Sequence, residues 1–206
     1  MSSDVELLHS WRDGDKDAGR ELFERYFPSL RRFFGNKVAS GVEDLVQSTM
    51  LACVESRDRI RDDSKFRAYL FGTARKQLLS VYASRRRDPV PLDTGIDCAS
   101  HLCPSPSLAL ARRGEDRLLL EAVRGIPLDF QMILELYYWE QLSTAELAQM
   151  LGVPLSTIKN RLVRARALLR EQVDELSRAG ERVNTTEDDI HSWARRIREY
   201  ADREGT

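Results

Sequence analysis

Apolar residues along this 206-residue chain recur mainly at intervals of three and four, the spacing that places side chains on one face of an α-helix. In the first part of the chain this spacing predicts helices over residues 5–12, 18–34, 42–56 and 64–86, with Ser64 as the N-cap of the last. Pro28 falls inside the second helix, where we expect it to kink or restart that helix. No segment shows the convincing two-residue alternation of a half-buried strand.

A change of composition divides the chain. Residues 88–106 contain four prolines, a glycine and serines, which is typical of an extended linker. Helical spacing then predicts helices over residues 108–124, 128–140, 143–151 and 155–176. We therefore predict an all-α protein of two small helical bundles (residues 1–87 and 107–178), joined by a flexible linker and followed by a C-terminal extension (residues 179–206).

Charge is unevenly distributed, although the net charge is only −1. Residues 65–87 contain seven basic side chains and no acidic one, and residues 155–170 contain five basic side chains and no acidic one. Two separate basic stretches at helical spacing indicate two contacts with a polyanion, for which nucleic acid is the natural candidate.

The remaining composition narrows the class of protein. No stretch approaches the roughly 20 apolar residues that span a bilayer, and the acidic N-terminus lacks the features of a signal peptide. The three cysteines form no disulfide framework, so we expect a cytoplasmic protein without membrane insertion. Cys98, His101 and Cys103 offer three zinc ligands with no fourth nearby, so we expect no metal.

Catalytic motifs are not apparent in the sequence. The three histidines, His9, His101 and His191, are scattered, and no metalloprotease, P-loop or nucleophile-elbow motif occurs. We predict a binding protein rather than an enzyme, with no catalytic residue and no cofactor.

The strongest local signal lies between residues 143 and 166. Ser143 and Glu146 have the spacing of a capping box, and Gly152 supplies a turn before a second helix. This is the pattern of a helix-turn-helix, which places the N-terminal part of its second helix in the major groove. A helical hairpin whose arginines only solvate the surface is the alternative. The positions of the second helix that we expect to be exposed are Lys159, Asn160, Arg161, Arg164 and Arg166.

Residue chemistry assigns these positions to two kinds of DNA contact. Ser156 and Thr157, near the N-terminus of the helix, can meet phosphates. Base edges or phosphates are the expected targets of Lys159, Asn160, Arg161 and Arg164.

Three segments of the chain resemble, in order, parts of the extracytoplasmic-function (ECF) sigma factors of the sigma-70 family. Residues 43–51 (EDLVQSTML) resemble the helix of that family that binds core polymerase, and residues 66–76 (FRAYLFGTARK) resemble its promoter-melting helix. Residues 142–166 resemble its reader of the upstream promoter element. The resemblance covers roughly residues 5–176, with the linker in place of a middle domain.

The resemblance implies an RNA polymerase sigma factor that directs promoter-specific transcription initiation. Core RNA polymerase and promoter DNA are the implied partners, with room for an anti-sigma factor. The implied contacts with core polymerase are Asp44, Leu45, Gln47, Met50 and Leu51, although core packing is an equal alternative for the two leucines. The implied contacts with the melted minus-ten strand are Tyr69, Arg75, Lys76, Tyr82, Arg85, Arg86 and Arg87. The helix-turn-helix residues named above would contact the minus-35 duplex.

Two positions depart from the family pattern. Tyr69 stands where most relatives have Trp, and Lys76 stands where most have Asn. Tyrosine keeps a ring for stacking, whereas lysine cannot reproduce the paired donor and acceptor of an amide. The departures at Tyr69 and Lys76 therefore leave the base identity of the minus-ten element open.

The C-terminal extension lies outside the resemblance. Ile190, Trp193, Ile197 and Tyr200 form an apolar stripe on a helix expected to begin near Thr186. We expect a regulatory helix that docks on one of the two domains or on a partner, with a frayed appendage as the alternative. For the whole chain, the alternative function is a stand-alone helix-turn-helix regulator, which would bind duplex DNA tightly without polymerase.

Overall fold

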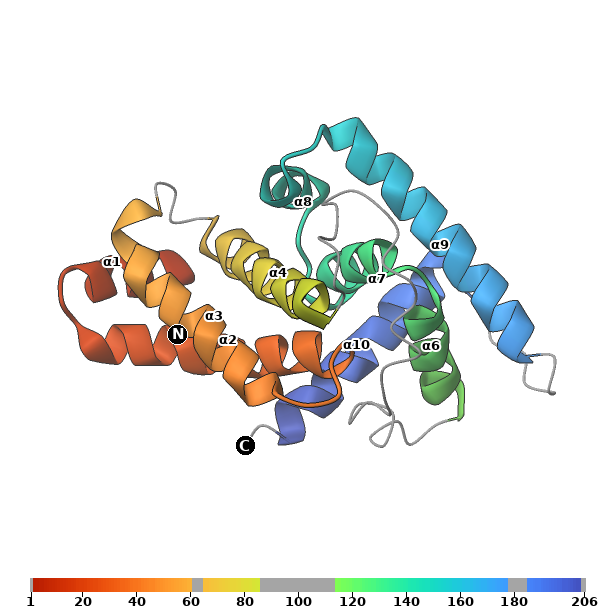
Figure 1. Ribbon diagram of the computed structural model, residues 1–206, viewed down its shortest axis with the longest axis horizontal. Helices are drawn as coiled ribbons and strands as arrows, with labels where there is room; N and C mark the ends of the chain where they lie inside the picture. Colours follow the sequence, from red (N-terminus) through yellow and green to blue (C-terminus); the bar gives the residue numbers. More distant parts are fainter. Residues whose placement is uncertain (1, 61–64, 86–113, 178–184, 205–206) are drawn as a thin grey trace. The chain divides into compact units, whose positions relative to one another are not determined.

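The computed structural model describes residues 2–60, 65–85, 114–177 and 185–204, and all regular structure in these ranges is helical (Figure 1). The predicted all-α fold is therefore confirmed. The described residues belong to two compact units, one of Met1–Phe34 with Gly41–Val90 and one of Gly35–Ser40 with Pro91–Thr206. The expected linker and the expected N-cap Ser64 lie outside the described residues.

The helices of the first unit begin close to their predicted positions. Ser3 caps the first helix through a capping box with Glu6, in which the Glu6 N–H donates to the Ser3 hydroxyl over 3.2 Å. Acidic residues in the first turns of the first and third helices favour these starts, because a helix N-terminus carries partial positive charge. The elements are α1 (Asp4–Arg12), α2 (Lys16–Gly35), α3 (Val42–Ser56), the 3₁₀ turn η1 (Arg57–Arg59) and α4 (Phe66–Arg85).

Helix α2 runs through Pro28 as one element. We expected Pro28 to kink the helix or to start a new one. The expected new start is wrong, because the helix continues through Pro28. Proline removes one hydrogen bond from the helix, and the buried side chains on both sides of it, Leu22 and Leu30, hold the element in place.

Aromatic and leucine side chains form the core of the first unit. Phe33 and Phe71 meet edge to face with ring centroids 5.8 Å apart, and Tyr26 meets Phe66 at 5.7 Å. Leu78 is fully buried on α4. Each such side chain contributes about 1.5–3 kcal/mol relative to an exposed position, so packing rather than helix propensity holds α2 and α4.

The second unit contains the helices predicted for the C-terminal part of the chain. The helix expected over residues 128–140 consists of an α-helical part and a π-helical turn. α6, α7 and α8 pack on α9, and α10 packs on the π-helical turn. The elements are α6 (Gly114–Gly125), α7 (Leu128–Leu134), η4 (Glu135–Trp139), α8 (Thr144–Leu151), α9 (Leu155–Ser177) and α10 (Glu187–Glu204).

A buried ion pair lies within the second unit, which includes the short segment Gly35–Ser40. The Lys37 ammonium donates to the Glu135 carboxylate, and both side chains are inaccessible to solvent. Gln131 donates a further hydrogen bond to Glu135 over 3.1 Å. Burial lowers the pKa of Lys37 and raises that of Glu135, and the mutual attraction acts against both shifts.

Candidate nucleic-acid and polymerase interfaces

The helix-turn-helix predicted from the sequence is present in the second unit. Ser143 caps α8 through a reciprocal pair of bonds with Glu146, 2.7 Å and 3.2 Å long. Gly152 ends α8 at φ 66°, the left-handed conformation that glycine adopts without strain. Leu147 on α8 and Ile158 on α9 are completely buried. The turn places α8 against α9 (Figure 1).

The residues predicted to read the minus-35 duplex lie together on the first turns of α9. Two positions expected to be exposed, Arg161 and Arg166, are instead half-buried. They are half-buried because they flank the buried stripe that contains Leu162 and Ala165. Thr157 is also half-buried. The remaining predicted contacts are exposed: Ser156, Lys159, Asn160 and Arg164.

The residues predicted to contact the minus-ten strand divide between two faces of α4. Tyr69 and Lys76 are seven residues apart and lie on the outward face, where Tyr69 is half-buried and Lys76 exposed. Tyr82 lies on the opposite face and is only 6% exposed. Arg75 is half-buried. Arg85 ends the helix, and Arg86 and Arg87 lie outside the described residues.

The residues predicted to contact polymerase also divide between two faces of α3. Leu45 is buried in the first unit at 8% exposure, Met50 is half-buried, and Leu51 is 56% exposed. Asp44 and Gln47 are exposed.

Asp44, Gln47, Leu51 and Val54 follow one another at intervals of three and four, and we call this stripe the exposed face of α3. Val54 is 40% exposed. The sequence analysis did not predict it as a contact with polymerase, although its spacing of three from Leu51 could have indicated it. Leu51 and Val54 therefore place two exposed apolar side chains next to each other on this face.

Neither a metal site nor a membrane-spanning helix is found in the part of the chain that the structure describes. No cluster of three or more histidine, cysteine or acidic side chains there is arranged to hold a metal ion. Cys98, His101 and Cys103 lie outside these residues. Within the same ranges, every helix is too short or too polar to cross a membrane.

Two family models match the chain in sequence order. Sigma-70 region 2 matches residues 22–88, which include α3 and α4. Sigma-70 region 4 matches residues 116–169, which include α8 and the first part of α9. Helix α10 lies beyond both matches.

Curated relatives align with most of the chain. The ECF RNA polymerase sigma-E factor of Escherichia coli strain K12 is 26% identical over 185 residues, covering 85% of this chain and 97% of that protein. Its counterpart in Haemophilus influenzae is 22% identical over 183 residues, covering 84% of this chain and 97% of that protein.

A solved structure has a similar fold. It is the sigma factor RpoE in complex with the anti-sigma factor NepR from Bartonella quintana, with a TM-score of 0.59 and 25% identity, covering 77% of this chain and 98% of that one. A stand-alone helix-turn-helix regulator would account for region 4 alone, whereas this chain has region 2 before it. The chain belongs to the sigma-70 family, as an ECF RNA polymerase sigma factor.

Proposed function

We propose that this chain brings core RNA polymerase to promoters through three surfaces: the first turns of α9, the outward face of α4 and the exposed face of α3. Residues 1–87 would bind polymerase and the minus-ten element, and residues 107–178 would bind the minus-35 element, with residues 88–106 linking them. The observation that carries the proposal is the helix-turn-helix geometry, in which a capped α8 and the Gly152 turn present an α9 whose first four turns are acid-free.

The first turns of α9 suit a duplex. Lys159, Asn160 and Arg164 are exposed donors on a helix whose N-terminal N–H groups also favour phosphate. A bidentate side-chain contact with a base contributes about 1–3 kcal/mol of discrimination. Neighbouring phosphate contacts fix the register of the helix in the groove. We therefore assign the minus-35 duplex to this helix.

The outward face of α4 suits an opened strand. Extruding a base from the stack costs a few kcal/mol, and stacking on an aromatic ring returns about 1–3 kcal/mol. Tyr69 and Lys76 lie on this face, two helical turns apart, whereas Tyr82 faces the core. We accordingly assign base stacking to Tyr69. Tyr82 is instead a core residue that packs α4 into the first unit.

The exposed face of α3 suits a protein partner. Leu51 and Val54 offer apolar surface beside the polar Asp44 and Gln47, as in an interface with an apolar centre and a polar rim. We assign core polymerase to this face. Leu45 is then a core residue that supports it.

The proposed activity is binding without catalysis, in the cytoplasm where the polymerase works. The solved relative was determined with an anti-sigma factor, which supports a protein inhibitor as a further partner of this chain.

Transcription in vitro tests the proposal. Core polymerase, with and without the full chain, is given a library of promoter fragments, and transcripts are sequenced. We expect transcripts that depend on the chain and share two sequence elements separated by a fixed spacing. A chain that neither binds core polymerase nor starts transcripts from any template would refute the proposal.

A further inference from the structure

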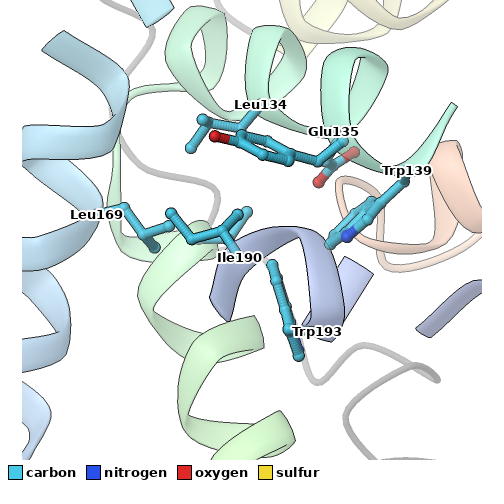
Figure 2. A pocket seen from close by; sticks show the side chains of 8 residues that line it. Leu134, Glu135, Trp139, Leu169, Ile190 and Trp193 are labelled. Atoms are coloured by element: carbon cyan, nitrogen blue, oxygen red, sulfur yellow. The ribbon is translucent and has the colours of Figure 1, made fainter. Parts of the chain in front are cut away.

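Helix α10 is packed into the second unit through three residues of its predicted apolar stripe, while the side chain of Tyr200 lies outside what the structure describes. Ile190, Trp193 and Ile197 are 1%, 2% and 6% exposed. The rings of Trp193 and Trp139 meet edge to face with centroids 5.4 Å apart. Figure 2 shows Ile190 and Trp193 facing Leu134, Trp139 and Leu169. The C-terminal extension, which we call the tail, is therefore docked on the second unit through α10.

Polar contacts fix α10 at two places. Arg196 donates to the fully buried carboxylate of Asp116 on α6, over 2.7 Å and 3.1 Å. At its other end, the Thr186 hydroxyl accepts from the Asp189 N–H over 3.2 Å and caps the helix. The start of α10 is thus held in one position beside α9.

That start contacts two arginines of α9. The carboxylate of Glu187, the first residue of α10, accepts a hydrogen bond from the Arg166 guanidinium. The backbone carbonyl of Thr185 accepts from Nε of Arg170 over 3.2 Å. The tail therefore occupies hydrogen-bond donors of two arginines on α9, the proposed DNA-binding helix.

Lys159, Arg166 and Arg170 lie on one edge of α9, which we call the basic edge. Their spacings of seven and four are close to whole numbers of helical turns, so the three side chains project along one side. This side flanks the face that contains Asn160 and Arg164. A helix in the major groove has a phosphate backbone along each flank.

Arg166 is already oriented for an anion. Its Nε donates to the Tyr138 hydroxyl over 2.7 Å, and its guanidinium lies 5.6 Å from the centre of the Tyr138 ring. Its side chain retains 18% exposure. Guanidinium binds carboxylate and phosphate oxygens in the same fork geometry, so Glu187 occupies a position that a phosphate also fits.

We propose that Arg166 and Arg170 of the basic edge bind a backbone phosphate of promoter DNA, and that Thr185 and Glu187 of the tail compete for these two arginines. This inference rests on the proposed contact of α9 with the minus-35 duplex. The tail then lowers promoter affinity, and loss of its carboxylate frees Arg166 for DNA. Each additional phosphate that the protein neutralises steepens the dependence of log affinity on log salt concentration by about 0.9.

The test measures binding of holoenzyme, made with the full chain, to a duplex containing the minus-35 element selected in the library experiment. Glu187→Gln removes the competing charge, and Asp188→Asn is the matched control because it makes the same charge change at the next, exposed residue. We expect Glu187→Gln to raise affinity about two- to fivefold, the range of an exposed ion pair, with a steeper salt dependence. The Asp188→Asn variant should change both quantities much less.

Two further variants test whether the increase in affinity passes through the basic edge. Arg166→Gln combined with Glu187→Gln should lose that increase. Arg170→Gln, at an exposed position whose loss leaves the core intact, should lower affinity and reduce the salt slope. Equal effects of Glu187→Gln and Asp188→Asn, or an increase that persists without Arg166, would overturn the inference.

The proposed function is tested separately in the same assay. Asn160→Ala and Arg164→Ala should reduce affinity whatever the state of Glu187. If they do so while Glu187→Gln matches its control, α9 reads DNA and the inference about the tail alone is wrong. If neither reduces affinity, both proposals fail. Replacing chloride by inorganic phosphate at equal ionic strength should leave the effect of Glu187→Gln in place; its disappearance would identify a site for free anions instead.

Discussion

At the scale of single residues, burial controls chemistry. Cys53 of α3 is completely buried, and burial raises the pKa of its thiol to about 12, with a weaker opposing effect from a hydrogen bond with Thr73. A free thiol has a pKa of about 8.5, and only the thiolate reacts rapidly with alkylating agents. Folding therefore protects this cysteine.

We predict that Cys53 resists iodoacetamide at pH 8 in the folded protein and reacts fully in denaturant, as measured by mass spectrometry of peptides. The folded state keeps a proton that the unfolded state releases between about pH 9 and 12. Stability associated with Cys53 is therefore present below pH 9 and is lost as pH rises through that window. Cys53→Ala should flatten this part of the pH dependence of the unfolding free energy; an unchanged slope would contradict the assignment.

Lys76 gives the second prediction at this scale. An ammonium offers donors alone, whereas an amide offers both donors and an acceptor. We predict that Lys76→Asn changes the preferred base at one minus-ten position, measured by transcription of the promoter library. Ser80→Asn, one turn further along the same exposed side of α4, should leave the preference unchanged. The same base preference in the wild type and in Lys76→Asn would exclude Lys76 from reading that element.

At the scale of elements, the contact between α1 and α2 depends on a glycine. A Cβ placed on Gly19 would lie 2.5 Å from Cδ1 of Trp11, whose ring is buried against Phe23 with centroids 5.2 Å apart. We predict that Gly19→Ala lowers the unfolding free energy by about 1–3 kcal/mol, the usual cost of overpacking. Thermal melting measures the change, and the matched control is Gly35→Ala, where a Cβ meets nothing within 4 Å. A melting temperature for Gly19→Ala equal to or above that of the control would show that Trp11 moves freely.

The exposed face of α3 gives a second prediction for an element. Leu51→Ser should weaken binding to core polymerase at least about fivefold, because a central apolar side chain in an interface contributes more than about 1 kcal/mol. Its melting temperature should stay near that of the wild type, since Leu51 is 56% exposed. Val5→Ser, at an apolar side chain of α1 that is 37% exposed, serves as the control for loss of surface apolarity. Equal polymerase binding by both variants would place the interface elsewhere.

At the scale of the whole molecule, function requires several surfaces to act together. Each proposed DNA contact is small, and joining contacts through one polymerase raises the effective concentration of each. We predict weak binding of the chain alone to duplex promoter DNA, and strong binding with strand opening in the holoenzyme. Gel shift with and without core polymerase measures the first, and permanganate reactivity of thymines measures the second. Tight duplex binding without polymerase would instead favour the stand-alone regulator.

The sequence alone determined that the fold is helical and where several helices begin, because the start of a helix depends on neighbouring residues. The Ser143 and Glu146 capping box and the left-handed Gly152 are local, and they appear where the spacing predicted them. The family resemblance was likewise contained in short collinear segments. The C-terminal helix begins within a residue of its expected start at Thr186.

On α3 and α4, where apolar or aromatic side chains lie on more than one face, only the tertiary structure decided which face is covered. Helical spacing shows that Tyr69 and Tyr82 lie on different faces, but packing against the other helices of the unit decides that Tyr82 is the buried one. The same holds for Leu45 and Leu51 on α3. The contact of Arg166 with Glu187 joins residues 21 positions apart, so no local pattern contains it. Burial depends on which distant segments meet, whereas the start and end of a helix depend on the few residues beside them.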